Sequence, residues 1–133
     1  MTNEPGPERP QGQPSPAPTT KHQYSTGPLV LPENAPFLGL HVLNNSASQQ
    51  TIHVFVYQLN SPAAKTVVHT NIMVLAPNES NRDLLSFQPG FYGEVQIHCD
   101  SRRVLPHVYY ADPSATPIRG GNIHAASFIR RLP

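Results

Sequence analysis

Three neighbouring residues with reactive side chains, His98-Cys99-Asp100, are the first candidates for chemistry in this chain. A cysteine thiolate activated by an imidazole is a common nucleophile. Adjacent residues of a strand point to opposite faces, however, so a strand here keeps the His98 ring away from the Cys99 sulfur. We therefore predict no catalytic dyad, and we expect Cys99, the single cysteine, to be a small buried apolar residue.

Histidine is enriched and could supply metal ligands. Six histidines are spread about one to each apolar segment: His41, His53, His69, His98, His107 and His124. Ligands need only converge in space, so a site built from several strands is one interpretation. No His-x-His pair occurs, and we favour surface histidines whose nitrogens reach water. We predict no metal and no cofactor.

Other catalytic signatures are missing from the sequence. It contains no G-x-S-x-G elbow, phosphate-binding loop or H-E-x-x-H motif, and its carboxylates are scattered. We predict that the protein is not an enzyme and has no catalytic residues. The pairs Arg102-Arg103 and Arg130-Arg131 are expected to be solvated, with an acidic partner or an anionic glycan as the alternative.

The elements that would position these residues are short strands. Apolar runs alternate with turn residues at the spacing of a β-sandwich. We expect strands at 37–43, 51–59, 66–75, 82–88, 91–99, 104–110 and 121–130. The predicted fold is all-β, a single antiparallel sandwich of Greek-key or jelly-roll type with seven to eight strands, spanning residues 37–133.

Alternation within the strands predicts which side chains face the core. The expected inward set is Leu38, Leu40, Val42, Ile52, Val54, Val56, Val95, Ile97, Cys99, Ile123, Ala125, Ser127 and Ile129. Phe55, Tyr57 and Leu59 then occupy the face that should be exposed to solvent, with Tyr109 and Phe128 as candidate neighbours. Cover by another molecule and cover by the same chain both remain open.

Residues 1–36 hold nine of the sixteen prolines and are predicted to form an extended tail. Leu29-Val30-Leu31 is an apolar stretch between two prolines, and it is either an eighth strand or a plug for another subunit's sheet. We expect a chain starting near Ala35 to fold without the tail. The predicted interface residues are Leu29, Val30, Leu31, Phe55, Tyr57, Tyr109 and Phe128.

Charge and hydropathy argue against two classes of binding partner. Residues 37–133 carry seven Lys or Arg and five acids, a net of +2, which is too mild to favour nucleic acid. No apolar stretch approaches the roughly 20 residues of a membrane span, and the N-terminus does not look like a secretory signal. We expect neither a nucleic-acid nor a membrane partner.

The domain resembles small all-β proteins of the spore surface and endospore appendages of endospore-forming bacteria. The resemblance covers about residues 37–131. It rests on the order and spacing of 42–46 (VLNNS), 54–60 (VFVYQLN), 74–78 (VLAPN), 94–97 (EVQI) and 123–124 (IH). It implies a fibre-forming sandwich whose N-terminal connector reaches preceding subunits, made in the mother-cell cytoplasm and placed on the spore surface or in an extracellular appendage. The tail has no cysteine, so a disulfide-locked connector is not implied.

Two hypotheses follow. The first is a structural subunit that assembles with copies of itself, and with other spore-surface proteins, into a filament or layer, its tail contacting neighbouring subunits. The second is a non-catalytic binding module for a glycan or a protein, with the tail as linker or anchor. The absence of tryptophan disfavours a sugar platform, so we favour the structural hypothesis.

Overall fold

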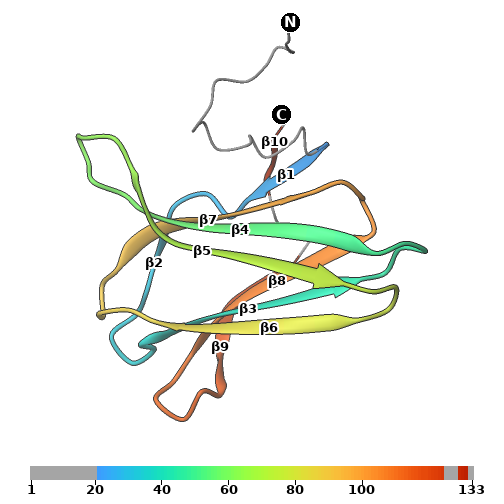
Figure 1. Cartoon of the computed structure of the whole chain (residues 1–133). Helices are drawn as coiled ribbons and strands as arrows, with labels where there is room; N and C mark the ends of the chain where they lie inside the picture. The colour runs from blue at the N-terminus through green and yellow to red at the C-terminus, as the bar shows by residue number, and fades with distance from the viewer. Residues whose placement is uncertain (1–20, 125–128, 132–133) are drawn as a thin grey trace, which may run out of the picture.

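The computed structural model describes residues 21–124 and 129–131, which form two stacked antiparallel sheets (Figure 1). Sheet A has the order β10-β1-β7-β4-β5, with β2 also paired to β7. Its strands are β1 (His22–Ser25), β2 (Leu29–Val30), β4 (Gln50–Gln58), β5 (Thr66–Leu75), β7 (Tyr92–Cys99) and β10 (Ile129–Arg131). Sheet B has the order β6-β3-β8-β9, with β3 (Phe37–Asn44), β6 (Ser80–Ser86), β8 (Val104–Ala111) and β9 (Pro117–His124). The predicted all-β antiparallel sandwich is confirmed.

The chain passes repeatedly from one sheet to the other. Only three consecutive pairs stay within a sheet: the hairpins β4–β5 and β8–β9, and the strands β1 and β2, which both pair with β7. Inward side chains of both sheets therefore come from segments distant in sequence. No helix in the described residues is long and apolar enough to cross a membrane.

The core lies between the sheets where alternation placed it. All nine inward residues predicted on the first, second and fifth of the expected strands are buried, Cys99 among them. Met73, Leu75, Val104 and Val108 complete the cluster. The expected strand 121–130 is instead two strands, β9 in sheet B and β10 in sheet A. Ala125 and Ser127 lie outside the described residues, as do the side chains of Ile123 and Ile129.

The predicted domain boundary at residue 36 is wrong. His22–Ser25 pairs with β7 on one side and with β10 on the other, and Leu29-Val30 pairs with the start of β7. Leu29, Leu31 and Ala35 are buried. The sandwich therefore begins at about residue 21, and only residues 1–20, which lie outside the described part, remain of the predicted tail.

The prolines misled the prediction because they stand between the paired residues and not within them. Pro28 precedes β2 and Pro32 follows it, so neither removes a ladder hydrogen bond. The Leu31 N–H donates to the Phe91 carbonyl at 2.9 Å, and the Gly90 N–H donates to the Leu31 carbonyl at 2.9 Å. This stretch is thus held by backbone pairing as well as by burial.

Candidate assembly surface

The outer face of sheet A carries a line of rings along β4. His53, Phe55 and Tyr57 alternate with the buried Ile52, Val54 and Val56, so all three rings point away from the core. The ring centroids of His53 and Phe55 lie 6.5 Å apart, and those of Phe55 and Tyr57 lie 6.4 Å apart. The Phe55 ring also contacts His98 of β7, with centroids 4.8 Å apart. Phe55 and Tyr57 therefore lie on the outer face of their strand, where alternation placed them.

Beside these rings lies a buried carboxylate, Glu94. Lys65 Nζ donates to Glu94 Oε1 at 2.7 Å, Gln96 Nε2 donates to Oε2 at 3.0 Å, and the Ser25 hydroxyl also donates to Oε2. Burial raises the pKa of Glu94. The three hydrogen bonds and the Lys65 charge together outweigh burial, so the net pKa lies below the ordinary value of 4.5.

Ser25 and His98 contact different side chains of this cluster. The Ser25 hydroxyl donates to Glu94, whereas His98 Nε2 lies 3.1 Å from Gln96 Oε1. Lys65 neutralises the carboxylate and also lies over the Tyr57 ring, 4.4 Å from its centroid. The cluster joins β1, β7 and the loop after β4 into one surface.

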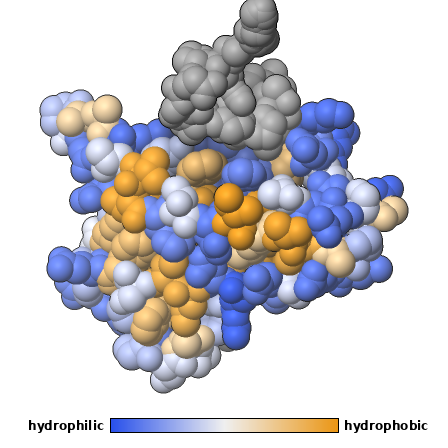
Figure 2. All heavy atoms as spheres, in the orientation of Figure 1, coloured by the Kyte–Doolittle hydropathy of each residue, from blue (hydrophilic) through white to orange (hydrophobic). Residues whose placement is uncertain are grey.

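The neighbouring strand β5 exposes apolar side chains on the same outer face. Register places Ile72 opposite His53 and Val67 opposite Tyr57, and Val74 continues the row. Ile72 is 60% exposed, Val74 54% and Val67 50%. Figure 2 shows apolar side chains gathered on the face of the molecule that β5 crosses. Large apolar groups side by side in water are typical of a contact surface.

The same strand is an edge of sheet A, because β5 pairs only with β4 in the described residues. It has ten residues and contains no proline and no Lys, Arg, Asp or Glu. Two inward side chains of its first half are polar: Asp83 Oδ2 of β6 lies 3.2 Å from His69 Nε2 and accepts from Asn71 Nδ2 at 3.0 Å. These contacts link β5 to β6 across the two sheets. The backbone N–H and C=O groups on the free edge of β5 have no strand partner in the described residues.

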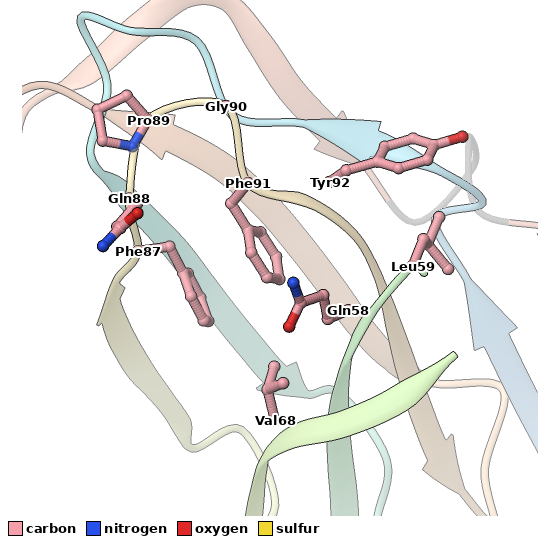
Figure 3. Close-up of a pocket in the computed structure, with 9 residues that line it drawn as sticks. All are labelled: Gln58, Leu59, Val68, Phe87, Gln88, Pro89, Gly90, Phe91 and Tyr92. Carbon is pink, nitrogen blue, oxygen red and sulfur yellow. The ribbon is translucent and has the colours of Figure 1, made fainter. Parts of the chain in front are cut away.

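A second feature is a hollow of about 430 Å³ at the end of the sandwich where β7 begins (Figure 3). Its lining residues are Gln58, Leu59, Val68, Phe87, Gln88, Pro89, Gly90, Phe91 and Tyr92. The Phe87 and Phe91 rings stack with centroids 4.2 Å apart. Gly90, at φ 83°, supplies the left-handed residue of the turn before β7.

Three of the seven predicted interface residues, Leu29, Leu31 and Tyr109, are buried within the chain's own fold. Leu29 and Leu31 are core residues, which corrects their prediction as a plug for a neighbour, and Val30 between them is 53% exposed. Tyr109 is buried against Gly39 on the outer face of sheet B, so it is not available to a partner. Phe128 lies outside the described residues.

Phe55 and Tyr57 remain half-buried candidates on sheet A, next to residues that the sequence prediction missed. Strand 66–75 was predicted, but its outward Ile72 and Val74 were not singled out. The signal was available: Ile72-Met73-Val74-Leu75 is apolar on both strand faces, and only one face can meet the core. The hollow joins three separate segments, and no spacing rule connects them.

Cys99 is buried, and its sulfur lies 3.5 Å from the Ser101 carbonyl oxygen. Among the residues the structure describes, no group of three or more His, Cys, Asp or Glu side chains is placed to hold a metal ion. Arg102 and Arg103 are exposed in the turn between β7 and β8.

Comparisons with known proteins add little. No protein-family model and no curated protein matches the chain. The crystal structure of Thermotoga maritima 1070 aligns with it at a TM-score of 0.47 and 7% identity, covering 85% of this chain and 92% of that chain. A likeness this distant supports no argument about function.

Proposed function

We propose that the protein is a structural subunit that assembles with copies of itself into a filament or surface layer. The observation that carries this proposal is strand β5, an edge strand with three exposed apolar side chains on its outer face. A long apolar edge without charges or proline pairs readily with another strand, and natural proteins usually protect such edges. A second copy supplies a matching edge and a matching apolar row.

The neighbouring aromatic residues support the same role. Phe55 and Tyr57 extend the apolar surface of Ile72 and Val67 across β4, so a partner that pairs with β5 also covers rings. Buried aromatic groups contribute strongly to protein interfaces. The Lys65–Glu94 pair lies at the border of this surface, where a polar rim is expected.

Symmetry decides what such a contact can build. Pairing of β5 with β5 of a two-fold-related copy gives a closed dimer, and growth into a filament then needs a second contact of head-to-tail type. The proposed place of assembly, the spore surface, is supported by the resemblance of residues 37–131 to spore-surface proteins. Immunogold labelling of intact spores of the source organism tests that location.

The proposal is tested by imaging and sedimentation of the full chain. We expect wild-type protein to form filaments or sheets in negative stain. Ile72→Lys should prevent them while the circular dichroism spectrum keeps its β form, because the charge sits where the partner would exclude water. Leu105→Lys is the matched control, since Leu105 is a 40% exposed leucine on β8 of sheet B. A wild-type chain that stays monomeric up to millimolar concentration contradicts the proposal.

A binding module is the second candidate function, and the aromatic hollow at the start of β7 is the observation that favours it. In that case the chain remains monomeric and the hollow holds a foreign ligand. The two functions differ in one measurement, the molar mass of the purified chain as a function of concentration.

A further inference from the structure

The hollow at the start of β7 has the chemistry of a peptide site. No lysine, arginine, aspartate, glutamate or histidine lines it. Figure 3 shows the Phe87 and Phe91 rings side by side, with Gln58 pointing between Phe91 and Val68. Tyr92 is 42% exposed. The lining therefore offers flat apolar rings, two glutamine amides and one phenol hydroxyl.

Aromatic rings with a few hydrogen-bond donors suit one class of ligand, a polyproline II segment. Proline rings lie flat on aromatic side chains, and the carbonyls of such a segment have no internal partners, so they accept from amide and hydroxyl donors. The segment is stiff before it binds, and little conformational entropy is lost on binding. A charged peptide would leave its charges unmatched, because the lining has no charged residue.

The chain itself carries such a segment. Residues 14–18 read Pro-Ser-Pro-Ala-Pro, with three prolines in five residues and no charge. The earlier prolines, 5–10, enclose Glu8 and Arg9, which an uncharged lining does not match. We propose that the hollow binds residues 14–18 of a second copy of this chain. The proposal deepens the self-assembly proposed above and rests on it, because it names the head-to-tail contact that a filament needs.

Geometry excludes the chain's own residues 14–18 as occupant. The segment joins the sandwich at the far end of β7, where His22 pairs with Cys99 and the Lys21 N–H donates to Asp100 Oδ1 at 3.2 Å. The hollow lies at the Tyr92 end of the same strand, about 23 Å away at roughly 3.3 Å per residue. Pro18 is three residues before Lys21 and reaches at most about 11 Å, and Pro16, at the centre of the motif, reaches at most about 18 Å. The complete motif therefore cannot lie in its own hollow.

The same geometry makes the contact open-ended. The proline-rich segment leaves one end of the sandwich and its receptor lies at the other end. A segment from each copy filling the hollow of the next copy repeats without closing, which is the requirement for a filament.

A fluorescent peptide of residues 12–20 tests the site by anisotropy. The receptor is the full chain with Pro14, Pro16 and Pro18 replaced by alanine, so that no receptor copy can supply a competing motif. We expect saturable binding, and loss of at least tenfold in affinity when the three peptide prolines are alanine. Tyr92→Ala in the receptor should weaken binding at least tenfold and Tyr92→Phe by less, because the ring is kept. Leu105→Ala, at a residue of similar exposure on β8, should leave binding unchanged.

The outcomes separate this inference from the proposed function. Assembly of the wild-type chain together with no binding of the 12–20 peptide overturns the inference and leaves self-assembly standing. Binding of the peptide at the hollow together with a wild-type chain that stays monomeric up to millimolar concentration overturns both, because the hollow then does not join copies of the chain. Equal binding of the alanine peptide, equal binding to the Tyr92→Ala receptor, or tighter binding of a peptide of residues 4–11 also overturns it. A circular dichroism spectrum for each receptor shows whether loss of binding reflects loss of fold, and Gln58→Ala then serves as the second variant.

Discussion

The outer faces of the two sheets treat their apolar residues differently. On sheet B, Tyr109 of β8 lies across Gly39 of β3, where a Cβ atom on residue 39 would overlap the ring, and only 4% of Tyr109 is exposed. On sheet A, Ile72 and Val74 of β5 lie opposite His53 and Thr51 of β4 and are more than half exposed. The missing side chain at Gly39 leaves the room that the Tyr109 ring fills on sheet B.

The two surfaces are expected to have different roles, one in stability and one in assembly. Tyr109 and Gly39 on sheet B contribute to folding, since the Tyr109 ring is buried within one chain. The apolar row on sheet A gains most of its burial only when another molecule covers it. Substitutions on sheet B should therefore change the free energy of unfolding, and substitutions on β5 should change association.

Removing residues 1–36 should unfold the protein. The deletion takes β1 and β2 from sheet A and empties the core positions of Leu29 and Leu31, each worth about 2–5 kcal/mol. Together these losses rival the whole net stability of a domain, about 5–15 kcal/mol. A chain beginning at Lys21 should keep its cooperative thermal transition. A well-folded chain beginning at Phe37 would show that sheet A does not need its N-terminal strands.

Tyr109→Ala should lower the free energy of unfolding by about 3 kcal/mol, the cost of removing a large buried ring. Gly39→Ala should also destabilise in the wild-type background, by about 1–3 kcal/mol, because the new methyl group displaces the ring. In the Tyr109→Ala background the same change should be neutral or stabilising. Urea denaturation of the four chains measures this coupling, and strictly additive effects would contradict the ring-on-glycine contact.

Glu94→Gln should cost about 1–2 kcal/mol at neutral pH, because the charged partner of three hydrogen bonds is lost. The folded pKa of Glu94 lies below its unfolded value near 4.5, so its contribution is present above that value. It is lost as the pH falls through the folded pKa. The variant should therefore show a smaller loss of stability than wild type on acidification below about pH 4.5. Parallel acid-side slopes in thermal melts would count against this role.

Ile72→Ser and Val74→Ser should change the free energy of unfolding by no more than about 0.5 kcal/mol, as exposed positions usually do. Chemical denaturation at a dilution where the chain is monomeric measures this. The comparison between the sheets fails if either substitution costs as much as Tyr109→Ala, because the β5 row would then be part of the folded core.

Most of the fold could be predicted because alternation is a local signal. Ile97 lies between Gln96 and His98, and one buried face per strand follows from the geometry of the backbone. Position within a sheet is not local. The pairing of His22–Ser25 with β7 depends on residues more than 70 positions away, and a polar, proline-flanked segment gives no sign of it.

The candidate surface divides in the same way. Phe55 and Tyr57 were found because they break the alternation, whereas Tyr109 was misassigned because its partner Gly39 has no side chain for a pattern to detect. The hollow was not foreseen, since Gln58, Val68 and Phe91 become neighbours only after the chain has folded.

By itself the sequence determined that this chain forms β-strands, which side chains of the expected strands 37–43, 51–59 and 91–99 face the core, and that its first residues are rich in proline. Those properties depend on the period of side chains along a strand and on the fixed φ of proline, both of which act over a few residues. Only the tertiary structure decided where the domain begins, which strand is left at the edge, and which aromatic residues remain uncovered. These depend on which strands become neighbours, and that is set by the burial and hydrogen bonding of the whole sandwich at once.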